Sequence, residues 1–206
     1  MKERKHTALI ITEGEDEEGL VTALISHLSL TECDVINAEG RSNLKNRTAA
    51  ALKTPGPPVR ALAIVRDAES SPAQTRQSTC DILNGLGFVA PNAAFEIAES
   101  ADVVCGYAIL PDAVRPGAIE DICLGSLRNE AASGCVDLFF DCLGKSGVGC
   151  GRSGQVVKKA RVQAYLAACA TDRVVHRAGL GFLKGHFDLD SKCLASMRAF
   201  LQLLLK

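Results

Sequence analysis

Short apolar segments alternate with helix-length segments through the first half of the chain, and this alternation constrains the fold more than any other feature. Apolar runs at about 8–12, 33–38 and 61–65 lead into segments with helical spacing at about 17–29, 44–52 and 73–85. A strand–helix–strand order with short connections requires right-handed crossovers and a parallel sheet. We therefore predict an α/β fold with a small, mostly parallel sheet and helices on both faces.

The second half of the chain is expected to add one strong strand at 103–110 and several helices. The segment 88–97 is interpreted as an edge strand or hairpin arm, and helices are expected at about 126–143, 155–170 and 191–205. The glycine-rich segment 144–154 is interpreted as a flexible loop. A length of 206 residues fits one domain, with a core at about 8–125 and a helical C-terminal extension at about 126–206.

Composition argues against two classes of nucleic-acid-binding protein. The chain has no Trp, two Tyr and seven Phe, whereas a single-strand binder built on base stacking usually needs more aromatic side chains. A formal net charge of −1 argues against a large non-specific DNA-binding face, although a small basic patch beside an acidic site is compatible with it.

The cysteines and apolar runs predict a cytoplasmic location. The nine cysteines are odd in number and include no Cys-x-x-Cys pair, a pattern that favours reduced thiols over a zinc site. The apolar run after the charged N-terminus is too short for a signal peptide, and the run at 199–205 is too short to span a membrane. We therefore expect no membrane partner.

Acidic residues follow the first and third predicted strands. Glu13 ends the first strand, and Asp67 and Glu69 end the third, so parallel pairing brings all of them to the carboxyl edge of the sheet. An extended Asp-x-Glu segment points both carboxylates to the same side. Glu17 lies in the first turn of the following helix and can point back to this edge. Such a cluster attracts a hard divalent cation, which prefers oxygen ligands.

Simpler roles stay open for each acidic residue. Glu17 and Glu18 are also suited to interact with a helix dipole, and Asp67 can be part of the approach to the next helix. Glu120 follows a Pro-Gly turn after a strong strand, where it is either a further site residue or an ordinary first-turn acid.

Two other segments are candidates for contact with phosphate. Gly40, Arg41 and Ser42 follow the second strand, where glycine permits close backbone approach and the other two can bind a phosphate; the alternative is an ordinary helix entry with Ser42 or Asn43 as N-cap. Lys158 and Lys159 follow the glycine-rich segment, and one of them could neutralise a scissile phosphate; the alternative is a solvated helix face.

Taken together, these motifs resemble the Toprim superfamily, the catalytic domain of topoisomerases, primases and related proteins. The chain is similar to the small stand-alone Toprim-like proteins of prokaryotes and to the Toprim domain of overcoming-lysogenization-defect nucleases. The resemblance covers roughly residues 8–205. The segments that carry it are 11–18, 40–44, 65–69, 110–121 and 158–167.

The resemblance implies a Toprim-like fold and a site that uses Mg²⁺ or Mn²⁺ for phosphodiester chemistry. Glu13 matches the glutamate that acts as metal ligand or general acid/base, and Lys158 or Lys159 matches the lysine that contacts the scissile phosphate. The metal ligands that it implies are Glu13, Glu17, Asp67, Glu69 and Glu120. The family motif has a second aspartate where this chain has Glu69, which is one methylene longer and makes the geometry of two metal ions less certain.

Three hypotheses on function follow. The first is a metal-dependent nuclease or related phosphotransfer enzyme acting on nucleic acid. The second is a non-catalytic Toprim-like module that works in defence or repair with a partner protein such as an ATPase. The third is a nucleotide-binding module that uses the same edge without turnover. The sequence leaves open DNA against RNA, the partner and the oligomeric state.

Overall fold

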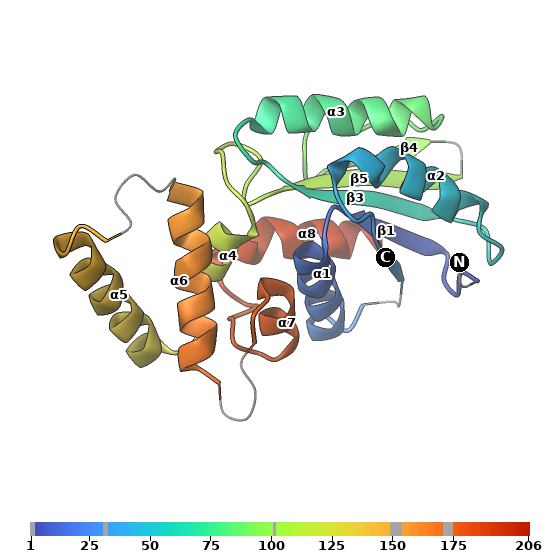
Figure 1. Ribbon diagram of the computed structural model, residues 1–206. Coiled ribbons are helices and arrows are strands. Elements are labelled where there is room, and N and C mark those ends of the chain that lie inside the picture. Colours follow the sequence, from blue (N-terminus) through green and yellow to red (C-terminus); the bar gives the residue numbers. More distant parts are fainter. Residues whose placement is uncertain (1–2, 31–32, 101, 149–153, 171–174) are drawn as a thin grey trace.

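The computed structural model describes residues 3–30, 33–100, 102–148, 154–170 and 175–206. It contains a five-stranded sheet in the order β2-β1-β3-β5-β4 (Figure 1). Four of the strands are parallel, and β4 runs antiparallel to β5 at one edge. The strands are β1 (Ala8–Thr12), β2 (Asp34–Asn37), β3 (Ala61–Asp67), β4 (Ile97–Ser100) and β5 (Val103–Leu110). The predicted α/β fold with a small, mostly parallel sheet is confirmed.

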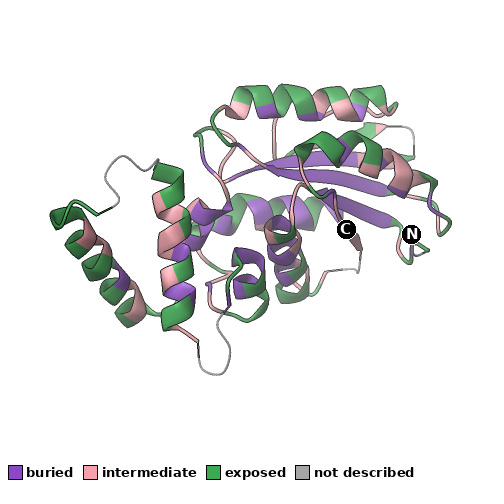
Figure 2. Ribbon diagram, in the orientation of Figure 1, coloured by how far each residue is buried: buried purple, intermediate pink, exposed green. Residues whose placement is uncertain are grey.

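The central strands are buried on both faces, which explains their continuous apolar runs. Every residue of β1 is buried, and its side chains alternate between two cores. Leu9 and Ile11 enter one core, whereas Ala8 and Ile10 enter the other. Figure 2 shows the buried strands enclosed by helices whose outer surfaces are exposed. This two-sided burial is typical of parallel sheets.

Helices cover both faces of the sheet. On one face lie α2 (Leu44–Lys53) and α3 (Pro72–Gly85), and on the other lie α1 (Glu15–His27) and α8 (Ala195–Leu204) (Figure 1). The ring of Phe200 lies directly over Gly106, where a Cβ atom would come within 2.6 Å of it. The C-terminal extension expected at 126–206 therefore contributes α8 to the core of the sheet.

The remaining helices form a second layer beside the sheet. They are α4 (Ile119–Gly125), α5 (Glu130–Lys145), α6 (Gly154–Ala168) and α7 (Ala178–Leu183). Two short 3₁₀ helices, η1 (Arg41–Asn43) and η2 (Lys192–Leu194), lead directly into α2 and α8. In Figure 1, α5 and α6 pack side by side at the end of the molecule farthest from the N-terminus. None of the helices in the described part of the chain is long and apolar enough to cross a membrane.

Element boundaries differ from the prediction where side chains and turns intervene. The edge strand expected at 88–97 begins only at Ile97, as β4. The preceding segment is not part of the sheet, because Pro91 cannot donate to a sheet ladder and Phe95 has φ 64°. The helix expected from 126 begins at Glu130, where the Asn129 side chain accepts a hydrogen bond from Ala132 N at 3.0 Å. The loop expected at 144–154 is shorter, because α5 and α6 extend into it; residues 149–153 lie outside the described part.

The expected start of α3 is confirmed. Ser71 is its N-cap and accepts a hydrogen bond from the backbone N–H of Gln74 at 3.3 Å, and Pro72 is the first helical residue.

A glycine pair fixes α7 against the first turns of α1. A Cβ atom on Gly19 would lie 2.5 Å from the backbone of Gly179, and one on Gly179 would lie 2.7 Å from the carbonyl oxygen of Glu15. The backbone N–H of Gly179 also donates to Asp16 Oδ1 at 2.9 Å. These contacts hold α7 close to the start of α1, beside the carboxyl edge of the sheet.

Candidate active site

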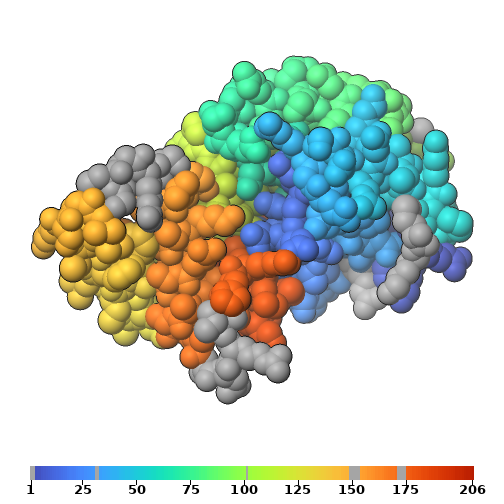
Figure 3. Space-filling model, in the orientation of Figure 1, coloured from blue at the N-terminus to red at the C-terminus, as the bar shows by residue number. Residues whose placement is uncertain are grey.

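A cavity of about 660 Å³ opens at the carboxyl edge of β1 and β3. In Figure 3 the orange surface of α6 and α7 adjoins the blue surface of α1 near this edge. Seven acidic residues line this cavity, which we call the carboxylate cavity. Four of them, from three segments, are predicted metal ligands: Glu13, Glu17, Asp67 and Glu120. The structure thus brings four of the five predicted metal ligands together.

Backbone hydrogen bonds bring the contributing segments to one place. The N–H of Glu13 donates to Val65 O at 3.0 Å, and the N–H of Gly40 donates to Glu13 O at 2.8 Å. The loop after β3 pairs with the segment before α4 through two hydrogen bonds between Glu69 and Gly117, at 2.8 and 2.9 Å. This pairing carries α4, and with it Glu120, to the end of β3.

Glu17 folds back over the strand–helix turn, as the sequence predicts. A Cβ atom on Gly14 would lie 2.9 Å from Glu17 Oε2, so a larger residue at this position would require the Glu17 carboxylate to shift. Glu17 is 6% exposed. Burial raises the pKa of Glu17 from 4.5 to about 7, and the nearby charges of Asp16 and Glu13 act in the same direction.

Asp67 lies at the centre of the cluster with one oxygen unsatisfied. Its Oδ1 is buried and has no hydrogen-bond partner among the described residues. Burial raises the pKa of Asp67 well above its usual value, and the charges of Glu17, Glu120 and Glu13 raise it further. An ionised carboxylate in this position needs a positive charge, and without one the group is held protonated.

The other two carboxylates are held by donors. Arg66 Nε donates to Glu13 Oε2 at 2.9 Å, and Gln155 Nε2 donates to Glu120 Oε2 at 2.7 Å. Arg66 is 6% exposed, so the ion pair with Glu13 is shielded from water. These two hydrogen bonds fix the orientation of the Glu13 and Glu120 carboxylates.

The structure distinguishes the two candidate lysines. Lys159 lines the carboxylate cavity, whereas Lys158 forms an ion pair with Asp121. Gln155, Lys159 and Gln163 are spaced by four residues and therefore share one face of α6. Gln163 also lines the cavity, so this face of α6 forms one of its walls.

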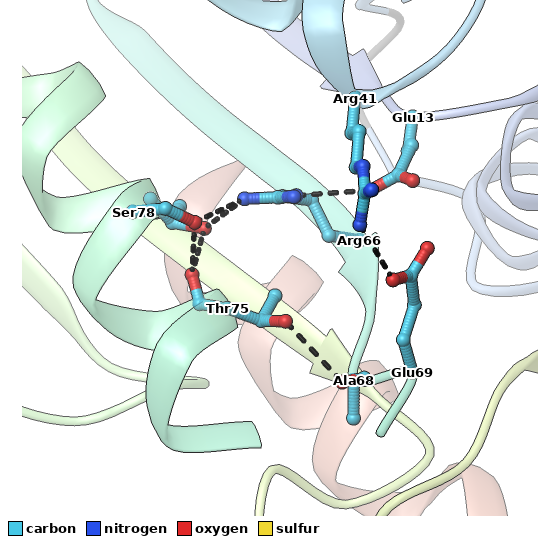
Figure 4. A network of polar contacts seen from close by, with 8 residues as sticks. Glu13, Arg41, Arg66, Ala68, Glu69, Thr75 and Ser78 are labelled. Atoms are coloured by element: carbon cyan, nitrogen blue, oxygen red, sulfur yellow. Dashed lines mark hydrogen bonds and ion pairs between the residues drawn. The ribbon is translucent and has the colours of Figure 1, made fainter. Parts of the chain in front are cut away.

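Glu69 lies apart from the other predicted ligands. The expected extended Asp-x-Glu geometry is wrong, because β3 ends at Asp67 and Glu69 has φ 51°. Its carboxylate forms an ion pair with Arg41 at 2.9 Å and lines a neighbouring cavity (Figure 4). Its role as a metal ligand stays a prediction that this arrangement does not favour.

The three residues predicted to bind phosphate do not act as a unit. Gly40 lines the carboxylate cavity with φ 107°, a conformation that suits glycine. Arg41 lines the neighbouring cavity, and Ser42 is exposed and lines neither. Asn43 occupies the N-cap position of α2, as the alternative role predicts, but it makes no capping hydrogen bond with its side chain. Its Nδ2 instead donates to Glu39 O at 3.0 Å.

The side chains of the carboxylate cavity are of the type that binds a divalent cation, although they do not converge on one coordination site. Among the described residues, no three His, Cys, Asp or Glu side chains already form a set that could hold a metal ion. The donor atoms are carboxylate oxygens, which Mg²⁺ and Mn²⁺ prefer. The buried Oδ1 of Asp67, which has no hydrogen-bond partner among the described residues, is the feature of the cavity that fits a cation.

Sequence reasoning assigned no role to Arg66, Gln155, Gln163 or Asp16. Arg66 is an arginine at the end of a strand that is otherwise apolar, and this signal could have revealed it. The glutamines carry no comparable signal, because their role depends on how α6 packs. Two further residues at the rim, His176 and Arg177, follow the undescribed segment 171–174; Arg177 forms an ion pair with Glu15.

The fold and the cavity together define an α/β protein with a mostly parallel sheet and a carboxylate-lined site at its carboxyl edge. The chain belongs to the family described as "Protein of unknown function (DUF3226)", whose model matches residues 7–206. No curated protein and no solved structure matches the chain. The function is therefore argued from the chemistry of the site.

Proposed function

We propose that this protein is a Mg²⁺- or Mn²⁺-dependent phosphodiester hydrolase of the Toprim type that acts on nucleic acid. The observation that carries the proposal is the buried, unpartnered oxygen of Asp67 beside Glu17 and Glu120. Carboxylates in this setting are stable in their ionised form only with a cation. The carboxyl edge of a parallel sheet is also where such folds bind their ligands.

The residues of the cavity divide into distinct roles. Glu17, Asp67 and Glu120 would hold the cation, which supplies activation of water and stabilisation of charge on the phosphate. Glu13 is oriented by Arg66 and would accept the proton from the attacking water. Lys159 lines the same cavity and would contact a non-bridging phosphate oxygen. The open space beside Gly40 would let a nucleic-acid strand approach the protein backbone there.

The first prediction is that activity depends on this cluster. Purified protein should cleave short DNA or RNA strands in Mg²⁺ or Mn²⁺, and Glu13→Gln or Asp67→Asn should lower the rate by about 10²-fold or more. Asp67→Asn should also weaken Mn²⁺ binding measured by calorimetry, a readout that does not depend on activity.

Asp102→Asn is the matched control, because Asp102 is 89% exposed in its side chain and lies at the opposite edge of the sheet. Cleavage that persists in EDTA, or that is equal in wild type and Asp67→Asn, contradicts the proposal.

The outer face of α5 favours a second candidate function, a non-catalytic module with a partner protein such as an ATPase. Cys135, Leu138, Phe139 and Cys142 are exposed and spaced as one helical stripe, with Leu138 71% and Phe139 53% exposed. The second function predicts Mn²⁺ binding without cleavage, and a copurifying partner that Leu138→Lys removes.

Calorimetry with mononucleotides tests the nucleotide-binding alternative. The free cysteines of the described residues are in keeping with a cytoplasmic location.

A further inference from the structure

A second cavity lies beside the carboxylate cavity, between η1 and the start of α3. It has a volume of about 440 Å³ and contrasts in chemistry with its neighbour. We call it the arginine pocket and define it by Arg41, Arg66, Glu69, Ser70, Ser71 and Ser78. Its walls are rich in guanidinium and hydroxyl groups, which are hydrogen-bond donors suited to an anion.

Arg66 links the two cavities. Its side chain lines the arginine pocket, while its Nε donates to Glu13 in the carboxylate cavity (Figure 4). Nη1 donates to Ser78 Oγ at 2.8 Å and to Thr79 Oγ1 at 3.2 Å, which fixes the plane of the guanidinium. Nη2 makes no hydrogen bond to any residue that the structure describes. The two N–H groups of Nη2 are therefore left to donate to a ligand of the pocket, and the bonds made by Nε and Nη1 hold them in a fixed orientation.

Arg41 is held by a contact that a ligand can replace. Its partner is Glu69, and the two side chains are 67% and 49% exposed. Exposed ion pairs contribute little to stability, so exchanging the Glu69 carboxylate for another anion costs little. Asp81, the other acidic residue of the pocket, accepts a hydrogen bond from Gln77 at 2.8 Å.

The chemistry of the pocket favours phosphate. Planar guanidinium groups bind phosphate oxygens through paired hydrogen bonds, and Ser70 adds a hydroxyl at the approach to α3. The Glu69 carboxylate that accepts from Arg41 is a local stand-in for such an anion. Because the Arg66–Glu13 ion pair separates the pocket from the carboxylate cavity, two ligands in the two cavities would be close neighbours.

We propose that the arginine pocket binds a backbone phosphate of the nucleic-acid strand, next to the phosphate held at the carboxylate cavity. This assignment rests on the proposed function for the identity of the strand, and it gives Glu69 the role of a competitor that covers Arg41 until the strand binds. It also predicts opposite effects of changing the two partners of one ion pair.

The test measures binding of a fluorescein-labelled single-stranded DNA oligonucleotide by anisotropy, in EDTA so that no metal contributes. Arg41→Gln should weaken binding about tenfold, and the slope of log affinity against log salt should become shallower by about 0.7. Glu69→Gln should tighten binding about threefold, because it frees Arg41. Arg115→Gln is the matched control, since Arg115 is also exposed and paired with an acidic side chain, that of Asp112.

Several outcomes overturn the assignment. One is equal affinity in Arg41→Gln and Arg115→Gln, and another is the absence of binding in wild type. Weaker strand binding and weaker Mn²⁺ binding in Glu69→Gln would return Glu69 to the metal ligands. Inorganic phosphate that binds more tightly than the oligonucleotide, with the same dependence on Arg41, would assign the pocket to free phosphate.

The two proposals fail separately. If wild type neither binds Mn²⁺ nor cleaves, binding in EDTA that depends on Arg41 still supports the arginine pocket. If cleavage depends on Asp67 but strand binding does not depend on Arg41, the proposed function stands and the pocket assignment falls.

Discussion

Glu17 and Asp67 are the side chains whose chemistry depends most on their surroundings. Both are carboxylic acids with a raised pKa, chiefly because burial disfavours the ionised form. Neighbouring Glu13 adds repulsion, although Arg66 offsets part of its charge. A protein seldom keeps such a cluster for stability alone, because apolar side chains of similar size would fill the space at lower cost.

At this scale we predict that Glu17 destabilises the metal-free protein at high pH. Its pKa is 4.5 in the unfolded chain and about 7 in the folded protein, so the folded state binds more protons between these values. Stability therefore falls as the pH rises from about 4.5 through 7. Glu17→Gln should raise the free energy of unfolding at pH 8 by up to about 3 kcal/mol and change it much less at pH 4.5.

Urea denaturation followed by circular dichroism in EDTA measures this difference. Glu99→Gln, an exposed change on β4, is the control and should alter stability equally at both pH values. An effect of Glu17→Gln that does not vary with pH would show that Glu17 has the same pKa in both states.

Among the elements, α1 and α7 determine how the site is closed. The close approach of Gly19 and Gly179 leaves no room for a side chain at either of these two positions. The hydrogen bond from Gly179 to Asp16 fixes α7 at the start of α1, directly after Glu13 and Gly14. This contact crosses more than 150 positions of sequence, so only the folded chain creates it.

Gly179→Ala should therefore destabilise the protein by about 1–3 kcal/mol, because the added methyl would overlap the backbone of α1. It should also weaken Mn²⁺ binding, since α1 carries Glu17. Gly134→Ala is the control: a Cβ atom at Gly134 meets nothing within 4 Å, and alanine is favoured inside a helix. Thermal unfolding by calorimetry should show no loss for Gly134→Ala. An equal effect of the two substitutions would contradict the close helix contact.

In the whole molecule, an acidic cavity and an arginine-containing cavity lie next to each other at the carboxyl edge of the sheet. The carboxylate cavity lies on one side of the Arg66–Glu13 ion pair and the arginine pocket on the other. The net charge of −1 hides this separation, because opposite local charges cancel in the sum. A small basic site next to an acidic one is suited to a strand that needs both a cation and direct contacts to its phosphates.

We expect stabilisation by Mn²⁺ to increase with pH. A cation that binds Glu17 and Asp67 must displace protons, so its apparent affinity should rise between pH 5 and pH 8. The rise in melting temperature at saturating Mn²⁺, followed by calorimetry, should be larger at pH 8 in wild type and absent in Asp67→Asn. A shift of equal size at both pH values would exclude these carboxylates as the ligands.

Much of the fold could be predicted because it depends on local patterns. Apolar runs and their spacing predicted the parallel strands, and the Ser71–Pro72 pair predicted the start of α3. The edge strand β4 was misplaced, because Pro91 and the left-handed backbone at Phe95 outweighed the apolar pattern. The grouping of Glu13, Glu17 and Asp67 also followed from the sequence, because parallel strands end at the same edge.

The sequence by itself determined the class of fold and the acidic character of the carboxyl edge, since both depend on neighbours in the chain. Only the tertiary structure decided which side chains meet there. It turned Glu69 toward Arg41, placed Lys159 rather than Lys158 at the cavity, and made Arg66 the wall between two pockets. The physical reason is that side-chain direction depends on backbone dihedral angles and helix packing, which contacts between distant residues determine.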